Sequence, residues 1–247
     1  MVNLFDVGLV FEQIPELLRY LYVNLEIAAI ALVVGWLLGL LIAVIRMSKI
    51  PVLYQLATLF VSAIRGTPII VQLYVTYFGI PILLRYINYY QGTSFDFNGI
   101  PPVVYAVVAL GLNQAAFDSE TIRSAIQSVD NGQIEAAQSL GMSDGQILRR
   151  VLLSQAVTVA IPPLGNSLIG LIKGTSLVFV CSVIDMTAAG KIIAGRDFRY
   201  FEVYVSIGLI FWALTIIIEL VFKHLEKRFS VPTEPPVVKA ENLLKGR

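Results

Sequence analysis

Residues 130–156 read DNGQIEAAQSLGMSDGQILRRVLLSQA and form the longest polar-rich interval between two apolar blocks of the chain. Within it, Asp130 is followed three residues later by Gln133, and Ser143 is followed in the same way by Gln146. Each pair can satisfy free backbone N–H groups at a helix start as a capping box. The interval therefore predicts two helix starts in close succession.

Gly141 lies between these two helix starts. A helix over residues 133–140 needs a left-handed closing residue at that position, and glycine adopts this conformation without strain. We therefore expect two short helices that meet at a sharp turn. A shaped, polar helix pair between membrane segments favours a docking surface.

The composition is that of an integral membrane protein. Of the 247 residues, 57% are hydrophobic and 14% are charged, which is too little polar surface to cover a soluble globule of this size. The net charge of +1 and the lack of a basic stripe exclude nucleic acid as a partner. Cys181, the one cysteine, lies in an apolar run and is expected to be a buried, inert thiol.

Five apolar segments are long enough to cross the membrane as helices. Pro68 is expected to kink the second, and Pro162 and Pro163 are expected to weaken the fourth. Exposed loops are expected over residues 85–99 and 185–202. The predicted spans are residues 27–45, 51–84, 100–117, 155–184 and 203–222.

The termini carry weaker signals. Residues 1–18 lack a basic region and do not resemble a cleavable signal peptide, so an interfacial segment is expected there. Residues 230–247 are expected to be a disordered tail, which leaves a single membrane domain over residues 1–229, with the docking loop at 130–156.

Basic residues predict the orientation of the chain. With the docking loop and the C-terminus inside, eleven Lys and Arg residues lie inside and five outside, while Arg65 and Lys173 lie at membrane depth. The C-terminus is therefore expected in the cytoplasm and the N-terminus outside. The inside set is Arg46, Lys49, Arg123, Arg149, Arg150 and six tail residues, and the outside set is Arg19, Arg85, Lys191, Arg196 and Arg199.

Four sequence patches resemble those of ABC importer permeases of the polar amino-acid uptake branch. They are RGTP at 65–68, AFDSETIR at 116–123, GQIEAA at 132–137 with Gly141, and PLGN at 163–166 leading to KGTSL at 173–177. The similarity covers about residues 21–229. The loop over residues 184–202 looks most like that of permeases for L-cystine. One departure is Ser154, where the family usually has a proline; it leaves the bend behind the coupling turn in doubt.

The resemblance implies the type I importer permease fold. It implies a bacterial cell membrane, a second permease chain that is identical or related, two ABC ATPase subunits docked at the coupling loops, and an extracellular solute-binding protein that delivers an amino acid. This chain has no phosphate-binding loop, because residues 170–176 have the wrong order and spacing. ATP and Mg²⁺ are therefore assigned to the partner ATPase, and this chain is expected not to be an enzyme.

The resemblance and the rarity of polar residues at membrane depth give two sets of candidate site residues. No catalytic residue and no metal ligand is predicted, and His224, the only histidine, is given no role. For ATPase coupling the candidates are Gly132, Gln133, Glu135, Ala136, Ala137, Gly141 and Ser143. For the substrate pathway they are Arg65, Thr67, Gln72, Asn113, Gln114, Phe117, Asp118, Glu120, Asn166, Lys173 and Thr175.

Plainer interpretations stand beside these. Arg65 can extend to the cytoplasmic surface, and Asp118, Glu120 and Arg123 can form interfacial salt bridges. An ion-coupled secondary transporter is an alternative, although it needs no docking loop and often shows inverted repeats, which are not evident here. An intramembrane enzyme is a weaker alternative, because Ser167 has no neighbouring histidine in the sequence.

Overall fold

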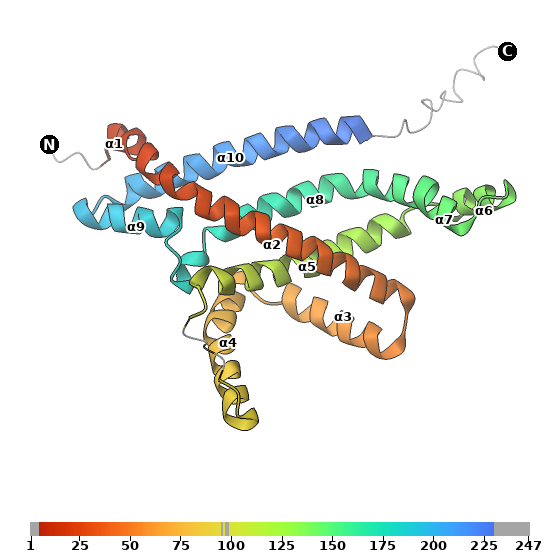
Figure 1. Ribbon diagram of the computed structural model, residues 1–247. Coiled ribbons are helices and arrows are strands. Elements are labelled where there is room, and N and C mark those ends of the chain that lie inside the picture. Colours follow the sequence, from red (N-terminus) through yellow and green to blue (C-terminus); the bar gives the residue numbers. More distant parts are fainter. Residues whose placement is uncertain (1–4, 95, 97–98, 230–247) are drawn as a thin grey trace, which may run out of the picture.

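The computed structural model describes residues 5–94, 96 and 99–229, and this part of the chain is helical apart from turns and short connections (Figure 1). The expected all-α fold is confirmed. The expected tail over residues 230–247 lies outside the described residues. The helices are α1 Val7–Glu12, α2 Ile14–Ser48, α3 Pro51–Arg65, α4 Ile69–Gln91, α5 Pro102–Gln127, α6 Asn131–Ser139, α7 Asp144–Ile147, the π-helix η1 Leu148–Leu152, α8 Leu153–Thr175, the 3₁₀-helix η2 Val178–Cys181, α9 Met186–Asp197 and α10 Tyr200–Phe229.

Four helical segments of the described chain are long and apolar enough to span a membrane: Ile14–Ser48, Ile69–Gln91, Asp144–Thr175 and Tyr200–Phe229. Helix α5 has 26 residues, sufficient in length, but polar side chains such as Asn113, Gln114 and Asp118 lower its hydropathy. The number of five spans therefore stays a prediction. Burial explains the polarity of α5, because α5 lies inside the bundle, with many of its residues buried.

Helices α2 and α5 form the centre of the bundle, beside α8 and α10 (Figure 1). Two glycines of α2 allow the close approach. A Cβ on Gly35 would lie 2.6 Å from Cγ of Gln114, and one on Gly39 would lie 3.2 Å from the carbonyl oxygen of Ala115. Small residues at such contacts let membrane helices pack closely.

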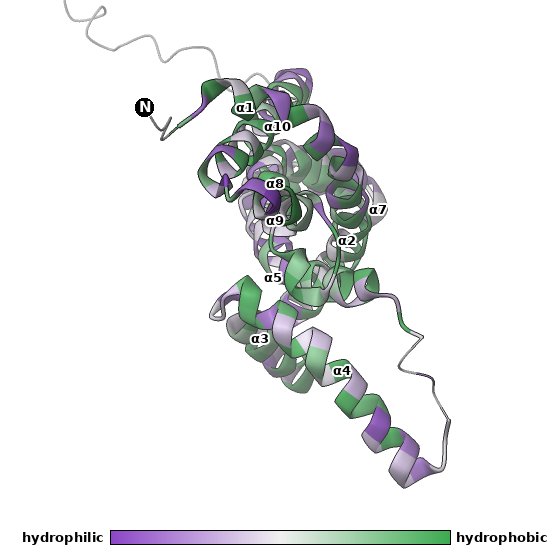
Figure 2. Cartoon of the chain, turned by 90° about the vertical axis from the view of Figure 1, so that its left-hand side faces the viewer, coloured by the Kyte–Doolittle hydropathy of each residue, from purple (hydrophilic) through white to green (hydrophobic). Residues whose placement is uncertain are grey.

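The prediction for the second span was wrong in one respect, because the helix there is broken rather than kinked. Helix α3 ends at Arg65, and α4 begins only at Ile69 and runs across the direction of the bundle (Figure 1), so that both helices stand apart from it in Figure 2. Pro68 has an extended conformation, with φ −64° and ψ 140°, and lacks the N–H that would continue α3. The hydroxyl of Thr67 donates to the carbonyl of Ala63 at 2.9 Å and closes α3.

The segment expected as a loop over residues 185–202 is largely helix α9. The Asp185 side chain caps its start by accepting from the N–H groups of Thr187 and Ala188, each at 3.0 Å. Gly190 allows α9 to pack on α10, because a Cβ there would lie 2.5 Å from Ile207 Cδ1. The polar residues of this segment include the cap Asp185 and the exposed Lys191, Arg196 and Asp197. Helix α4 also extends into the other expected loop, as far as Gln91.

Candidate functional site

The polar interval forms the predicted pair of short helices, α6 and α7. Asp130 caps α6 by accepting from the N–H of Gly132 at 2.7 Å. Ser143 and Gln146 form the complete capping box at the start of α7. Gly141 has φ +74°, the left-handed conformation that the sequence predicted for the turn. The start of α7 and the turn were thus predicted correctly from residue types and spacing, whereas at the start of α6 only the Asp130 cap of the expected capping box is formed among the described residues.

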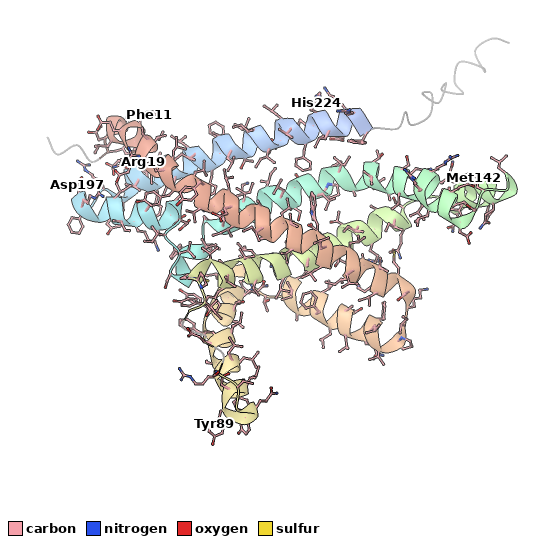
Figure 3. All side chains as sticks on the ribbon, viewed as in Figure 1. Phe11, Arg19, Tyr89, Met142, Asp197 and His224 are labelled. Atoms are coloured by element: carbon pink, nitrogen blue, oxygen red, sulfur yellow. The ribbon has the colours of Figure 1, made fainter. Side chains whose placement is uncertain are left out.

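The α6–α7 hairpin projects from one end of the molecule, where Met142 lies near its tip (Figure 3). Gly132, Gln133, Glu135, Ala136, Gly141 and Ser143 are exposed, so six of the seven coupling candidates lie on an accessible surface. Ala137 is the exception, with 4% exposure, and belongs to the packing beneath the hairpin. Leu140 is 83% exposed at the turn. The hairpin therefore presents both a carboxylate and an apolar side chain to a partner.

The hairpin continues without a break into the membrane part of the chain. Helix α7, the π-turn η1 and α8 form one helical segment, Asp144–Thr175, of 32 residues. Ser154 lies inside this segment and does not interrupt the helix, in contrast to the proline that the family usually carries there. Pro162 and Pro163 lie within α8 and do not interrupt it. A displacement of the hairpin can therefore be transmitted along a continuous helix.

A cavity of about 230 Å³ lies between the start of α4, α5 and α8. Three of the predicted pathway residues line it: Asn113, Gln114 and Phe117. The remaining wall is made of Ile69, Leu110, Ser167, Gly170, Leu171 and Gly174. The polar side chains thus come from α5 and from one residue of α8.

Asp118 is fully buried behind this wall and is not among the residues that line the cavity. One carboxylate oxygen accepts from the Ser167 hydroxyl at 2.6 Å, and the other accepts from the Gln114 amide nitrogen at 2.7 Å. The same amide nitrogen donates to Ser167 Oγ at 2.8 Å. The carboxylate therefore orients two cavity residues.

A second hydrogen-bond chain holds Asn113. Its amide nitrogen donates to Gln72 Oε1 at 3.0 Å. The amide nitrogen of Gln72 in turn donates to the carbonyl oxygens of Ile64, at 2.8 Å, and Thr67, at 3.0 Å. Gln72 and Thr67 are thus placed between the broken ends of α3 and α4, and they support the cavity rather than line it.

Glu120, near the end of α5, forms salt bridges with three arginines. It pairs with Arg46 of α2, with Arg123 at 2.7 Å, and with Arg65 of α3 at 3.8 Å. The salt-bridge interpretation is therefore correct for Glu120 and Arg123. The Arg65 side chain is 45% exposed, and its guanidinium lies 5.3 Å from the ring centroid of Phe117, a residue of the cavity wall.

Three other pathway candidates lie away from the cavity. Lys173 faces a separate hollow with Ser176, Gly208 and Trp212. The positions of α8 that form the cavity wall are Ser167, Gly170, Leu171 and Gly174. Thr175 is fully buried and accepts from Asn24 at 3.1 Å. Asn166 is exposed on α8 and also lies outside the lining.

Sequence reasoning missed the buried polar node around Asn24 of α2. Its amide nitrogen donates to Thr175 of α8 and to Asp185, the cap of α9, each at 3.1 Å. Its oxygen accepts from the N–H of Met186 at 3.1 Å. The available signal was an uncharged polar residue at the edge of an apolar run, and it identifies neither partner.

The sequence and the fold were compared with known proteins. Residues 35–231 match the family described as binding-protein-dependent transport system inner membrane component. The probable amino-acid permease protein YxeN of Bacillus subtilis (strain 168) is 37% identical and covers 94% of this chain and 99% of its own length. The L-cystine transport system permease protein TcyL of the same organism is 38% identical, with 93% and 94% covered. A crystal structure of an amino acid ABC transporter with histidines has a TM-score of 0.77 at 34% identity, with 91% and 99% covered.

Proposed function

Because the chain belongs to the binding-protein-dependent transport system inner membrane components, the permease subunits of ABC importers, we propose that it forms part of the substrate pathway of an ATP-driven amino-acid importer. The protein is a transport subunit, and the ATPase of such an importer is a separate subunit. The observation that carries the proposal is the continuous helix from the exposed hairpin to the cavity wall. This helix connects the surface proposed to contact the ATPase with the cavity proposed to hold the substrate.

In the coupling step, the exposed surface of α6 and α7 sits in a groove of the ATPase subunit. Glu135 supplies a charged contact and the apolar tip at Leu140 supplies burial, since both side chains are exposed in the single chain. Closure of an ATPase pair around ATP and Mg²⁺ moves the hairpin, and α8 carries the movement to the cavity. Access to the cavity then changes from one side of the membrane to the other.

The substrate is an amino acid, and L-cystine is the specific proposal. The relatives named for amino-acid and L-cystine transport support it, as does the loop pattern that α9 occupies. The cavity wall offers amide groups for polar substrate atoms. Arg65, which lies beside Phe117 of the cavity wall, supplies the cation for the substrate carboxylate.

The complete importer contains a second permease chain, identical or related, two ATPase subunits and an extracellular solute-binding protein. The apolar surface of α4 supports an assembly, since little of its most apolar part is buried within the chain and lipid or another chain must cover it. The excess of Lys and Arg on the hairpin side supports a cytoplasmic C-terminus and an outside N-terminus in a bacterial cell membrane.

The docking step is tested by reversing one charge on α6. We expect Glu135→Arg to weaken binding of the purified ATPase subunits about tenfold or more, because a charge-assisted contact becomes repulsive. Glu226→Arg is the matched control, since Glu226 is exposed near the end of α10 and outside the hairpin. Unchanged ATPase binding by Glu135→Arg, measured on folded permease complex, contradicts the assigned docking surface.

A further inference from the structure

The free polar atoms of the cavity between α4, α5 and α8 can be identified from its hydrogen bonds. Asn113, Gln114 and Ser167 are the polar side chains of the lining, and the other lining residues are apolar or glycine. The Ser167 hydroxyl donates its proton to Asp118 and accepts from Gln114, so any capacity that it has left is that of an acceptor. The question is which ends of the two amides remain available.

Asp118 determines the orientation of Gln114. Its carboxylate can only accept hydrogen bonds, and it also accepts from the Ser167 hydroxyl. Gln114 presents its NH₂ group to Asp118 and Ser167, at 2.7 and 2.8 Å. Turning the amide over would place its carbonyl against a carboxylate oxygen. The Gln114 carbonyl oxygen is therefore directed away from Asp118.

The broken helix pair determines the orientation of Asn113 in the same way. The NH₂ group of Gln72 faces the backbone carbonyl oxygens of Ile64 and Thr67, which can only accept. The Gln72 carbonyl oxygen consequently faces Asn113 and fixes the Asn113 NH₂ group. Asn113 is thus left with its carbonyl oxygen free, as Gln114 is.

Within the described residues, no hydrogen bond engages Asn113 Oδ1 or Gln114 Oε1. Neither oxygen is completely buried. Both residues line the cavity, so both oxygens are open to the space that it encloses. The available polar surface of this wall consists of hydrogen-bond acceptors. Such a wall favours a group that carries several N–H donors and a positive charge.

We propose that Asn113 and Gln114 bind the ammonium group of the transported amino acid through their amide oxygens, and that Asp118 and Gln72 are positioning residues that keep those oxygens turned into the cavity. This assignment rests on the proposed function and adds the end of the substrate that this wall recognises. It also removes Asp118 from direct substrate contact. A buried carboxylate here acts through Gln114, although a direct ion pair with the ammonium would be the first expectation for an acidic residue in a membrane pathway.

The test compares an amino acid with its deaminated analogue on the assembled complex. The amino acid used is the one that binds most tightly in a competition screen of L-cystine and the common L-amino acids. If it is L-cystine, the analogue is dithiodipropionate, which keeps both carboxylates and lacks both ammonium groups. We expect Gln114→Met and Asn113→Leu each to weaken binding of the amino acid about tenfold, the effect of one hydrogen bond to a charged group, and to change binding of the analogue less than about twofold.

Asp118→Asn tests the positioning role. Asparagine can donate as well as accept, so the Gln114 amide can turn over, and we expect the preference for the amino acid over its analogue to fall. Ser119→Ala is the matched control on α5, because the Ser119 hydroxyl is buried, bonds to the carbonyl of Ala116 and lies outside the cavity. Its preference should equal that of the unaltered complex.

The preference ratio is independent of the amount of folded protein, since both ligands are measured on one preparation. A ratio unchanged by Gln114→Met, Asn113→Leu and Asp118→Asn overturns the assignment while leaving amino-acid transport intact. A complex that binds no amino acid in the initial screen overturns the proposed function and this assignment together.

Discussion

A few buried residues hold the side chains of the bundle and of the cavity wall in place. Asp118 and Asn24 are both fully buried in the bundle, where an unpaired polar group costs several kcal/mol. Each instead has more than one partner, on more than one helix. The sequence identified Asp118 as unusual because a charge in an apolar segment is rare. It could not show that the carboxylate turns away from the cavity, since this depends on the rotation of α5 against α8.

Removing Asn24 should destabilise the end of the molecule where α2, α8 and α9 meet. Asn24→Leu leaves Thr175 and the Met186 N–H without this partner, and we expect the free energy of unfolding to fall by about 2–3 kcal/mol. The measurement is thermal or denaturant unfolding of the complex in detergent. Asn166→Leu provides the control, because Asn166 is exposed and should change stability by less than about 0.5 kcal/mol. Equal stability of the two variants would show that the Asn24 node contributes little.

At the level of elements, local signals predicted the hairpin and tertiary contacts decided the rest. The caps at Asp130 and Ser143 and the turn at Gly141 act within a few residues, so their spacing was sufficient. The break between α3 and α4 was predicted only as a kink, because Pro68 indicates an interruption but not how far the next helix swings. Helix α9 was missed, since it is short and is stabilised by packing on α10.

The hairpin offers a paired test in two glycines. Gly141 and Gly145 both have open space where a Cβ would be added, but only Gly141 has a positive φ, of +74°. We expect Gly141→Ala to destabilise the hairpin by about 1–2 kcal/mol through backbone strain, and Gly145→Ala to be neutral or stabilising by up to about 1 kcal/mol in α7. Hydrogen exchange of the α6 amides should accelerate only in the first variant. Equal exchange in both would contradict a strained turn.

For the whole molecule, the bundle places a cavity with three polar side chains in its wall in the membrane part and an exposed hairpin at one end, joined by a single continuous helix. The family could be predicted from short motifs. The cavity wall could not, because Lys173 and Gly174 are neighbours in sequence and face different hollows. A rotation of about 100° around the helix, less than a third of a turn, separates this substrate candidate from a residue of the cavity wall.

Uptake of labelled L-cystine by the reconstituted importer tests the central claim most directly. The permease, its ATPase and its binding protein are placed in proteoliposomes with all ion gradients collapsed. We predict uptake that requires ATP and the binding protein, that is lost in Glu135→Arg, and that persists in Glu226→Arg. Uptake without nucleotide in a parallel preparation with an imposed ion gradient, or ATP-driven uptake unaffected by Glu135→Arg, would contradict transport powered through the α6–α7 hairpin.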